Sequence, residues 1–246
     1  MQNPPPPFAK PSAVAGLSAP APSLELVSVH VPKCGGSSLG VALGRAYGNG
    51  LLHDTGDRPG DPASPINVDP QRFFRQAQAT LPVLLAGKRA VHGHFHPRKY
   101  QAVQCSFRTA VIREPVARLI SHYFYWQTMP PEPHSLHQDF LRQRPSLEEF
   151  AQVPFLRHFY TRVFFGGMKL ADFDYIGTLE NMPAAVAAIG RGIGHPLELV
   201  KENLGANPGY QEGLARIRGE ATLWKRLAAL LEDDVRFYEN ARNRWS

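Results

Sequence analysis

The chain has 246 residues and a formal net charge of +6, and 43% of its residues are hydrophobic. This length suits one α/β domain with insertions and supplies enough apolar residues for a packed core. The positive charge favours anionic partners. We expect no nucleic-acid partner, because the chain has no Cys/His finger, basic heptad helix or aromatic RNA-binding strand motif.

The cysteine content and the N-terminal segment indicate where the protein works. Cys34 and Cys105 are the only cysteines, which excludes a disulfide framework and a four-thiolate metal site. No apolar run approaches the roughly 20 residues that span a bilayer, so we expect no transmembrane segment. Residues 1–23 are proline-rich, lack a secretory h-region and are predicted to be a disordered tail before a single domain over 24–246. A cytoplasmic location follows as an expectation.

The stretch from Leu26 to Leu43 combines a strand pattern, a glycine loop and a helix pattern. The β-branched run Val27–Val31 predicts a strand that stops at Pro32. An apolar pattern with helical spacing then begins at Leu39. Between them lie Lys33, Cys34, Gly35, Gly36, Ser37 and Ser38.

This loop has the chemistry of an anion cradle. Glycines adopt backbone angles closed to other residues, so successive N–H groups can converge at the positive end of a helix, beside hydroxyls and a lysine. The natural ligand is a phosphate or a sulfate. The loop is not a Walker A motif, because Lys33 precedes the glycines.

The next part of the chain reads as a loop, a short helix, two strands and a helix. Asp54–Pro70 is dense in Gly, Pro, Asp and Ser and predicts a surface loop, followed by a short helix over Gln71–Gln78. Arg89–Phe95 and Ser106–Ile112 predict buried strands. Pro115 predicts the start of a helix, because proline in the first turn loses no needed hydrogen bond.

The C-terminal half predicts a helical cap, a strand and two helices. Gln127–Gly167 alternates proline breaks with short helical patterns, which suits a cap over a sheet. Phe173–Leu179 predicts a strand and Met182–Ile193 an alanine-rich helix. Residues 194–218 look like loop, and Thr222–Arg242 predicts one amphipathic helix.

Strands that alternate with helices predict a three-layer α/β fold with a mostly parallel, P-loop nucleoside triphosphate hydrolase-like sheet. Ligands of such sheets bind beyond the carboxyl ends of the strands. Lys33, the segment His92–His96 and Arg113 each follow a predicted strand, so we expect them along one edge. Ser121, about two turns into the helix after Arg113, could join that guanidinium in holding a second phosphate.

His92, His94 and His96 alternate and would share one face of a strand. A metal site is one interpretation, but consecutive same-face residues lie roughly 6 to 7 Å apart and seldom converge on one ion without other ligands. One imidazole could instead serve as a general base. Structural roles remain open for His92 and His96.

These residues carry a resemblance to a known family. HVPKCGGSSL (His30–Leu39) resembles the 5'-phosphosulfate loop of sulfotransferases that use 3'-phosphoadenosine 5'-phosphosulfate (PAPS), and VIREPVARLISHYFYW (Val111–Trp126) resembles their 3'-phosphate motif. The resemblance is strongest to the carbohydrate group with the heparan sulfate 2-O- and 6-O-sulfotransferases and bacterial members. HGHF (His92–Phe95) is similar to the segment that supplies the base in the 2-O enzymes, and FDYIGTLENM (Phe173–Met182) to a later family strand.

The resemblance implies a reaction and a role for each motif residue. Lys33 would stabilise charge on the leaving phosphate during sulfuryl transfer to an acceptor hydroxyl of a carbohydrate or glycolipid. His94 would be the base, with His92 orienting or substituting for it. No metal is required. The implied ligands of the 5'-phosphosulfate are Lys33, Cys34, Gly35, Gly36, Ser37 and Ser38, and those of the 3'-phosphate are Arg113 and Ser121.

One departure and two alternatives accompany this interpretation. Cys34 stands where the family usually has threonine, which could make the loop sensitive to oxidation. A P-loop nucleotide kinase or NTPase would need a Walker-type lysine and a magnesium-binding carboxylate. A non-catalytic protein that binds anionic glycans would use a basic surface, for which the candidates are Arg98, Lys99, Arg118, Arg142, Arg157 and Arg162.

Overall fold

A computed structural model describes residues 23–199 and 209–245, so the predicted tail lies outside the described residues apart from Ser23. Its centre is a five-stranded sheet in the order β2-β3-β1-β4-β5, in which every neighbouring pair is parallel. The predicted mostly parallel α/β sheet is therefore confirmed. The strands are β1 (Ser23–His30), β2 (Leu51–His53), β3 (Ala90–Gly93), β4 (Gln104–Ile112) and β5 (Tyr175–Thr178).

β1 is the central strand of the sheet, and its side chains point alternately to the two faces. Leu26, Ser28 and His30 are two residues apart and share one face, whereas Val27 and Val29 point to the other. Leu26 packs with the buried residues of α1 (Gly36–Tyr47) and α8 (Met182–Gly192). Val27 and Val29 pack with the larger core on the opposite face. These are the three layers that the sequence predicts.

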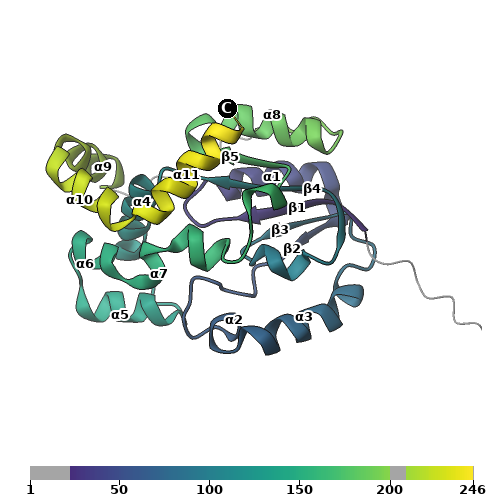
Figure 1. Cartoon of the computed structure of the whole chain (residues 1–246), viewed down its shortest axis with the longest axis horizontal. Coiled ribbons are helices and arrows are strands. Elements are labelled where there is room, and N and C mark those ends of the chain that lie inside the picture. Colours follow the sequence, from purple (N-terminus) through teal and green to yellow (C-terminus); the bar gives the residue numbers. More distant parts are fainter. Residues whose placement is uncertain (1–22, 200–208, 246) are drawn as a thin grey trace, which may run out of the picture.

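Most of the remaining helices lie on the second face or beyond the carboxyl ends of the strands, toward which the arrowheads point (Figure 1). α4 starts directly after β4, and α5, α6, α9 and α10 contact it. The short helices α5, α6 and α7 fall within Gln127–Gly167, so the predicted helical cap is confirmed. The helices are α2 (Pro65–Val68), α3 (Pro70–Leu84), α4 (Pro115–Thr128), α5 (Ser135–Gln143), α6 (Leu147–Gln152), α7 (Pro154–Arg157), α9 (Tyr210–Gly219), α10 (Ala221–Leu230) and α11 (Glu232–Arg244).

Short 3-10 and π-helical segments connect these elements. A π-helical segment, η3, follows α7 within the cap, and the other four are single turns of 3-10 helix. These segments are η1 (Gly48–Gly50), η2 (Pro97–Tyr100), η3 (Phe159–Phe164), η4 (Leu170–Asp172) and η5 (Leu179–Asn181).

Several predicted boundaries were wrong. The edge strand β2 was not predicted, because three residues are too few to show a period. α3 continues through Pro82, and α9 begins at Tyr210 inside the predicted loop 194–218, of which 200–208 lie outside the described residues. The predicted single C-terminal helix is in fact two helices, α10 and α11. The chain turns between them at Leu231, whose side chain is buried.

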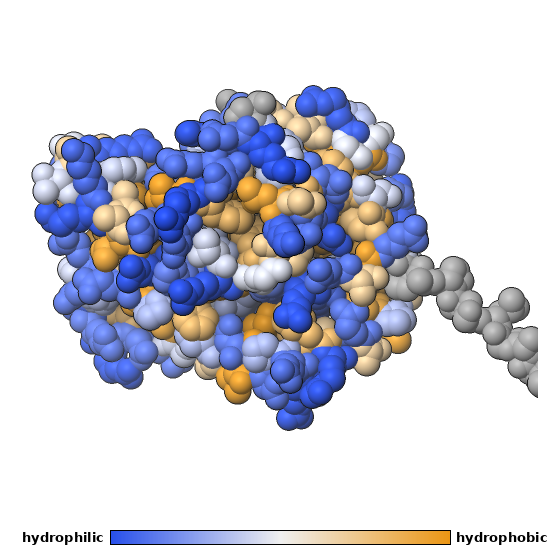
Figure 2. Space-filling view, viewed as in Figure 1, coloured by the Kyte–Doolittle hydropathy of each residue, from blue (hydrophilic) through white to orange (hydrophobic). Residues whose placement is uncertain are grey.

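The surface is mixed in hydropathy. On the face that Figure 2 shows, hydrophobic residues form small patches separated by hydrophilic ones. The exposed large hydrophobic residues of the described chain are Val68, Val83, Leu84 and Tyr125. Among the described residues, no helix is long and apolar enough to cross a bilayer.

Candidate functional site

The loop after β1 ends in an uncapped helix N-terminus. Lys33 and Gly35 have φ angles of 66° and 78°, so the chain turns sharply twice before α1. Gly35 is the N-cap and supplies no side-chain acceptor, and the first turn of α1 contains no acidic residue. The first N–H groups of a helix have no intrahelical partner. They therefore favour an anion, which fits the phosphosulfate that the sequence predicts here.

The side chains of the loop differ in exposure. Ser37 is exposed and Ser38 is half-buried, which leaves both hydroxyls near the surface of the loop. Lys33 is half-buried, and its Nζ lies 3.8 Å from the centroid of the Tyr125 ring on α4. Burial and the neighbouring Arg113 lower the pKa of Lys33. Its ammonium group is thus desolvated, and it interacts more strongly with any anion that approaches.

Cys34 points away from the cradle and into the core. Its side chain is fully buried, and its Sγ lies 3.5 Å from the hydroxyl of Tyr160. Burial raises the pKa of the thiol to about 11. The thiolate is the form that oxidises, so burial of Cys34 argues against the sensitivity to oxidation that the sequence suggested. Only its backbone can face an anion.

The second predicted motif lies against the first. The guanidinium of Arg113 donates through Nη1 to the carbonyl of Lys33 at 3.4 Å and through Nη2 to the hydroxyl of Tyr210 on α9. Ser121 is buried on α4, which begins two residues after Arg113. The structure therefore brings Arg113 to the cradle, as predicted from the shared sheet edge.

The start of α4 is occupied by its own cap and differs from that of α1. Both carboxylate oxygens of Glu114 accept hydrogen bonds, from the N–H groups of Val116 at 3.0 Å and Ala117 at 2.7 Å. A second phosphate would therefore depend on the side chains of Arg113 and Ser121, because the helix terminus already holds a carboxylate.

Tyr160 joins both motifs and was not predicted from the sequence. Its hydroxyl donates to the carbonyl of Arg113 at 2.6 Å and accepts from the N–H of the same residue at 3.0 Å. Its own N–H donates to the carboxylate of Asp234 on α11 at 2.9 Å. Tyr160 lies in η3, 47 residues after Arg113, and no local pattern marks it.

His94 has the hydrogen bonding expected of a base. β3 ends at Gly93, so His94 lies just beyond the carboxyl end of the sheet. Its Nδ1 lies 2.8 Å from the carbonyl oxygen of His30. A carbonyl only accepts, so Nδ1 carries the proton and Nε2 keeps its lone pair. Burial lowers the pKa of His94, and the bond to His30 opposes that shift.

The ring nitrogens of His92 both have partners. Nε2 donates to the carbonyl of Gly36 at 3.1 Å, and Nδ1 lies 2.9 Å from the hydroxyl of Ser28. The ring is 3% exposed, and burial lowers its pKa to about 4. This environment suits an orienting role better than proton transfer.

His96 lies apart from the other two predicted histidines. Its Nδ1 accepts from the N–H of Arg98 at 3.2 Å, and its ring packs edge-on against Phe74 of α3. The expectation that all three alternate along one strand was wrong, because β3 ends at Gly93. Within the described ranges, no three His, Cys, Asp or Glu side chains gather as a possible metal site.

Two members of the predicted basic surface are buried. Arg118 is 1% exposed, stacks on the ring of Phe159 at 4.0 Å and donates to the carbonyl of Leu156. Lys99 forms 2.7 Å ion pairs with Asp54 and Asp57. A continuous glycan-binding surface built on both residues is therefore contradicted.

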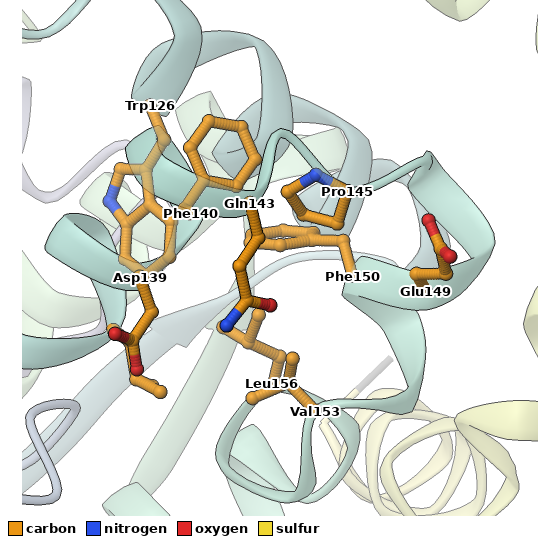
Figure 3. Close-up of a pocket in the computed structure, with 10 residues that line it drawn as sticks. Trp126, Asp139, Phe140, Gln143, Pro145, Glu149, Phe150, Val153 and Leu156 are labelled. Carbon is orange, nitrogen blue, oxygen red and sulfur yellow. The ribbon is translucent and has the colours of Figure 1, made fainter.

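Two hollows open elsewhere on the molecule. A cavity of about 320 Å³ lies in the helical cap, where the rings of Trp126, Phe140 and Phe150 form one wall (Figure 3). A groove of about 730 Å³ runs between α3 and η2. The described residues that line them include none of the predicted site residues.

Comparison with known proteins finds similarity to a sulfotransferase structure. No family model matches the chain, and no curated protein matches it. The crystal structure of mouse sulfotransferase SULT7A1 complexed with PAP is similar at a TM-score of 0.34 and 13% sequence identity. The alignment covers 79% of this chain and 63% of that chain, so this chain spans less than two thirds of that protein's length.

Proposed function

We propose that this protein is a PAPS-dependent sulfotransferase that acts on a hydroxyl of a carbohydrate or glycolipid-type acceptor. The observation that carries the proposal is the convergence of its two phosphate-type motifs. The Arg113 guanidinium contacts the carbonyl of Lys33 at 3.4 Å, beside the uncapped N-terminus of α1. The resemblance of these two segments to the PAPS-binding motifs agrees with that geometry.

The residues of the cradle fit the two ends of the cofactor. The first N–H groups of α1, with Ser37 and Ser38, would hold the 5'-phosphosulfate. Arg113 and Ser121 would hold the 3'-phosphate through side chains, since Glu114 caps α4. When bound, PAPS supplies an SO3 group that leaves the phosphate oxygen for the acceptor oxygen, yielding a sulfate ester and adenosine 3',5'-bisphosphate.

Lys33 and His94 would divide the work of catalysis. The ammonium of Lys33 would place positive charge beside the bridging oxygen, where negative charge grows as the bond breaks. In the structure this ammonium lies over the ring of Tyr125 on α4. The unprotonated Nε2 of His94 would accept the proton of the acceptor hydroxyl. His92 would keep Gly36 in place through its hydrogen bond to that carbonyl.

Cofactor binding is the first test. We expect adenosine 3',5'-bisphosphate to raise the melting temperature of the purified protein more than adenosine 5'-monophosphate, which lacks the 3'-phosphate. Arg113→Ala should remove the difference between the two nucleotides. Arg72→Ala, at an exposed position on α3, serves as the matched control and should keep it. Equal stabilisation of the wild type by both nucleotides would contradict the proposal.

Transfer is the second test. Labelled sulfate from PAPS should appear on at least one member of a panel of glycans, glycolipids and small alcohols. Lys33→Ala and His94→Ala should abolish that transfer while the melting temperature without ligand stays near the wild-type value. Magnesium-dependent ATP hydrolysis, combined with no response to PAPS, would instead support the kinase or NTPase alternative.

A further inference from the structure

Three imidazole rings lie face to face between the sheet and the start of α1. The ring of His30 is in the middle, with its centroid 4.1 Å from that of His94 and 5.2 Å from that of His92. The interplanar angles are 27° and 16°, so both pairs are stacked. His30 belongs to β1 and the other two to β3 and the residue beyond it. No catalytic or binding role was predicted for His30 from the sequence.

His30 constrains His94 through its backbone and through its ring. Its carbonyl oxygen takes the Nδ1–H of His94 at 2.8 Å, which selects the tautomer. Its ring covers one face of the His94 imidazole, which limits rotation of that ring about its side-chain bonds. The carbonyl remains when His30 is substituted, but its bond to Nδ1 requires the ring orientation that stacking on the flat side chain of His30 maintains.

His30 is itself fixed by the cofactor loop. A Cβ atom at position 36 would lie 1.8 Å from Cδ2 of His30, so the ring occupies space that only glycine leaves open. The other face of the His30 ring meets His92, whose two ring nitrogens are bound to Ser28 and Gly36. The His30 ring therefore packs against both the proposed base His94 and Gly36 of the proposed cradle.

The charges around the stack favour an uncharged His30. Burial, followed by repulsion from His94 and His92, lowers the pKa of His30 to about 2. Burial likewise lowers the pKa of His92, the bond to the Gly36 carbonyl opposes that shift, and repulsion from His94 and His53 adds to it. A neutral His30 can serve as a wall for His94 without competing for the proton that His94 would accept.

We propose that His30 is a positioning residue, which holds His94 as its Nδ1–H tautomer with the ring plane fixed relative to the cofactor loop. The effect on transfer rests on the proposed function, since it assumes that His94 is the base. The effect on the tautomer does not.

The tautomer can be measured without cofactor or substrate. Nitrogen-15 NMR of labelled imidazoles, with His94→Gln to identify the signal, should show the Nδ1–H form of His94 in the wild type. His30→Phe keeps a flat ring and should preserve that form. His30→Ala should give a mixture of His94 tautomers. If the alanine variant does not fold, His30→Leu is used in its place and should give the same mixture. A single unchanged tautomer in the alanine or leucine variant would overturn the proposal.

Kinetics provide the second readout, because a misplaced base lowers turnover more than binding. We expect His30→Ala or His30→Leu to reduce kcat about 100-fold. The affinity for adenosine 3',5'-bisphosphate should change less than about 3-fold if only the base moves. His30→Phe should recover kcat to within about 5-fold of wild type. His195→Ala, at an exposed histidine in the segment after α8, is the matched control and should change neither readout.

The outcomes separate the two proposals. If His30→Phe is folded but as slow as the alanine variant, a ring nitrogen is needed and the positioning role is overturned. If the wild type transfers no sulfate but the tautomer responds as expected, the proposed function fails and the positioning of His94 by His30 stands.

Discussion

The hydroxyl of Tyr160 pairs with both backbone groups of Arg113, accepting from its N–H at 3.0 Å and donating to its carbonyl at 2.6 Å. This pairing replaces the strand neighbours that Arg113 loses where β4 ends at Ile112. Because Tyr160 also contacts Cys34 and Asp234, it connects the cradle, the second motif and α11. The position of Arg113 therefore depends on a residue of the helical cap.

Removing that hydroxyl should affect stability and cofactor binding together. We expect Tyr160→Phe to lower the free energy of unfolding by about 2 kcal/mol, since two hydrogen bonds to a partly buried backbone are lost. The affinity for adenosine 3',5'-bisphosphate should fall as well. Urea unfolding and a binding titration measure the two effects. Tyr123→Phe is the matched control, because that hydroxyl donates to the carbonyl of Pro145 within the cap, and its loss should leave nucleotide affinity unchanged.

Two glycines of α1 should respond to alanine in opposite directions. Gly36→Ala places a methyl group 1.8 Å from the His30 ring, so we expect a loss of more than about 2 kcal/mol in the free energy of unfolding. A Cβ atom at Gly44 would meet no atom within 4 Å, and alanine there should stabilise by about 0.5–1 kcal/mol through helix propensity. Equal effects in thermal unfolding would contradict the close packing of His30.

Acid should destabilise the fold between about pH 6.5 and pH 4. Burial lowers the pKa of His92 and of His96 from 6.5 to about 4, so the unfolded chain binds more protons in this range. Stability from these groups is complete above pH 6.5 and is lost as the pH falls toward 4. For His92 the shift corresponds to on the order of 3 kcal/mol.

One carboxyl acts in the opposite direction. Burial, followed by repulsion from Asp54, raises the pKa of Asp57 from 3.8 to about 6, so its contribution is present below pH 3.8 and lost as the pH rises through 6. The two histidines, joined by His30, should outweigh it. Urea unfolding at pH 7.5, 6.5, 5.5 and 4.5 measures the balance, and a free energy that rises on acidification would contradict the buried neutral state of the histidines.

The two thiols should differ in reactivity. Cys34 is fully buried, and burial raises its pKa to about 11, whereas Cys105 is only half-buried. We expect a disulfide reagent to modify Cys105 first in the native protein and Cys34 only after urea unfolding. Mass spectrometry of peptides identifies the modified residue. Rapid labelling of Cys34 under native conditions would show that the loop opens far more often than its packing indicates.

Local patterns were sufficient where the chemistry is local. The β-branched run before Pro32, the glycines after Lys33 and the proline after Glu114 predicted two strand-to-helix turns, and α1 and α4 follow them. The shared sheet edge also predicted that Arg113 lies close to Lys33, and the Arg113 guanidinium donates to the Lys33 carbonyl. The prediction failed for β2 and for α9, because a three-residue strand and a helix after a proline-containing loop depend on packing more than on period.

The sequence by itself determined the parallel α/β fold and the order of the motif residues, since hydrophobic period and turn chemistry are properties of neighbouring residues. Only the tertiary structure decided which side chains face the edge. It turned Cys34 inward, buried Arg118 and Lys99, brought Tyr160 to Arg113 and stacked His30 on His94. The last two relationships join residues 47 and 64 positions apart, and the others bury side chains that the sequence placed in the cradle or on a basic surface. They therefore arise from the packing of the sheet against α1 and the cap.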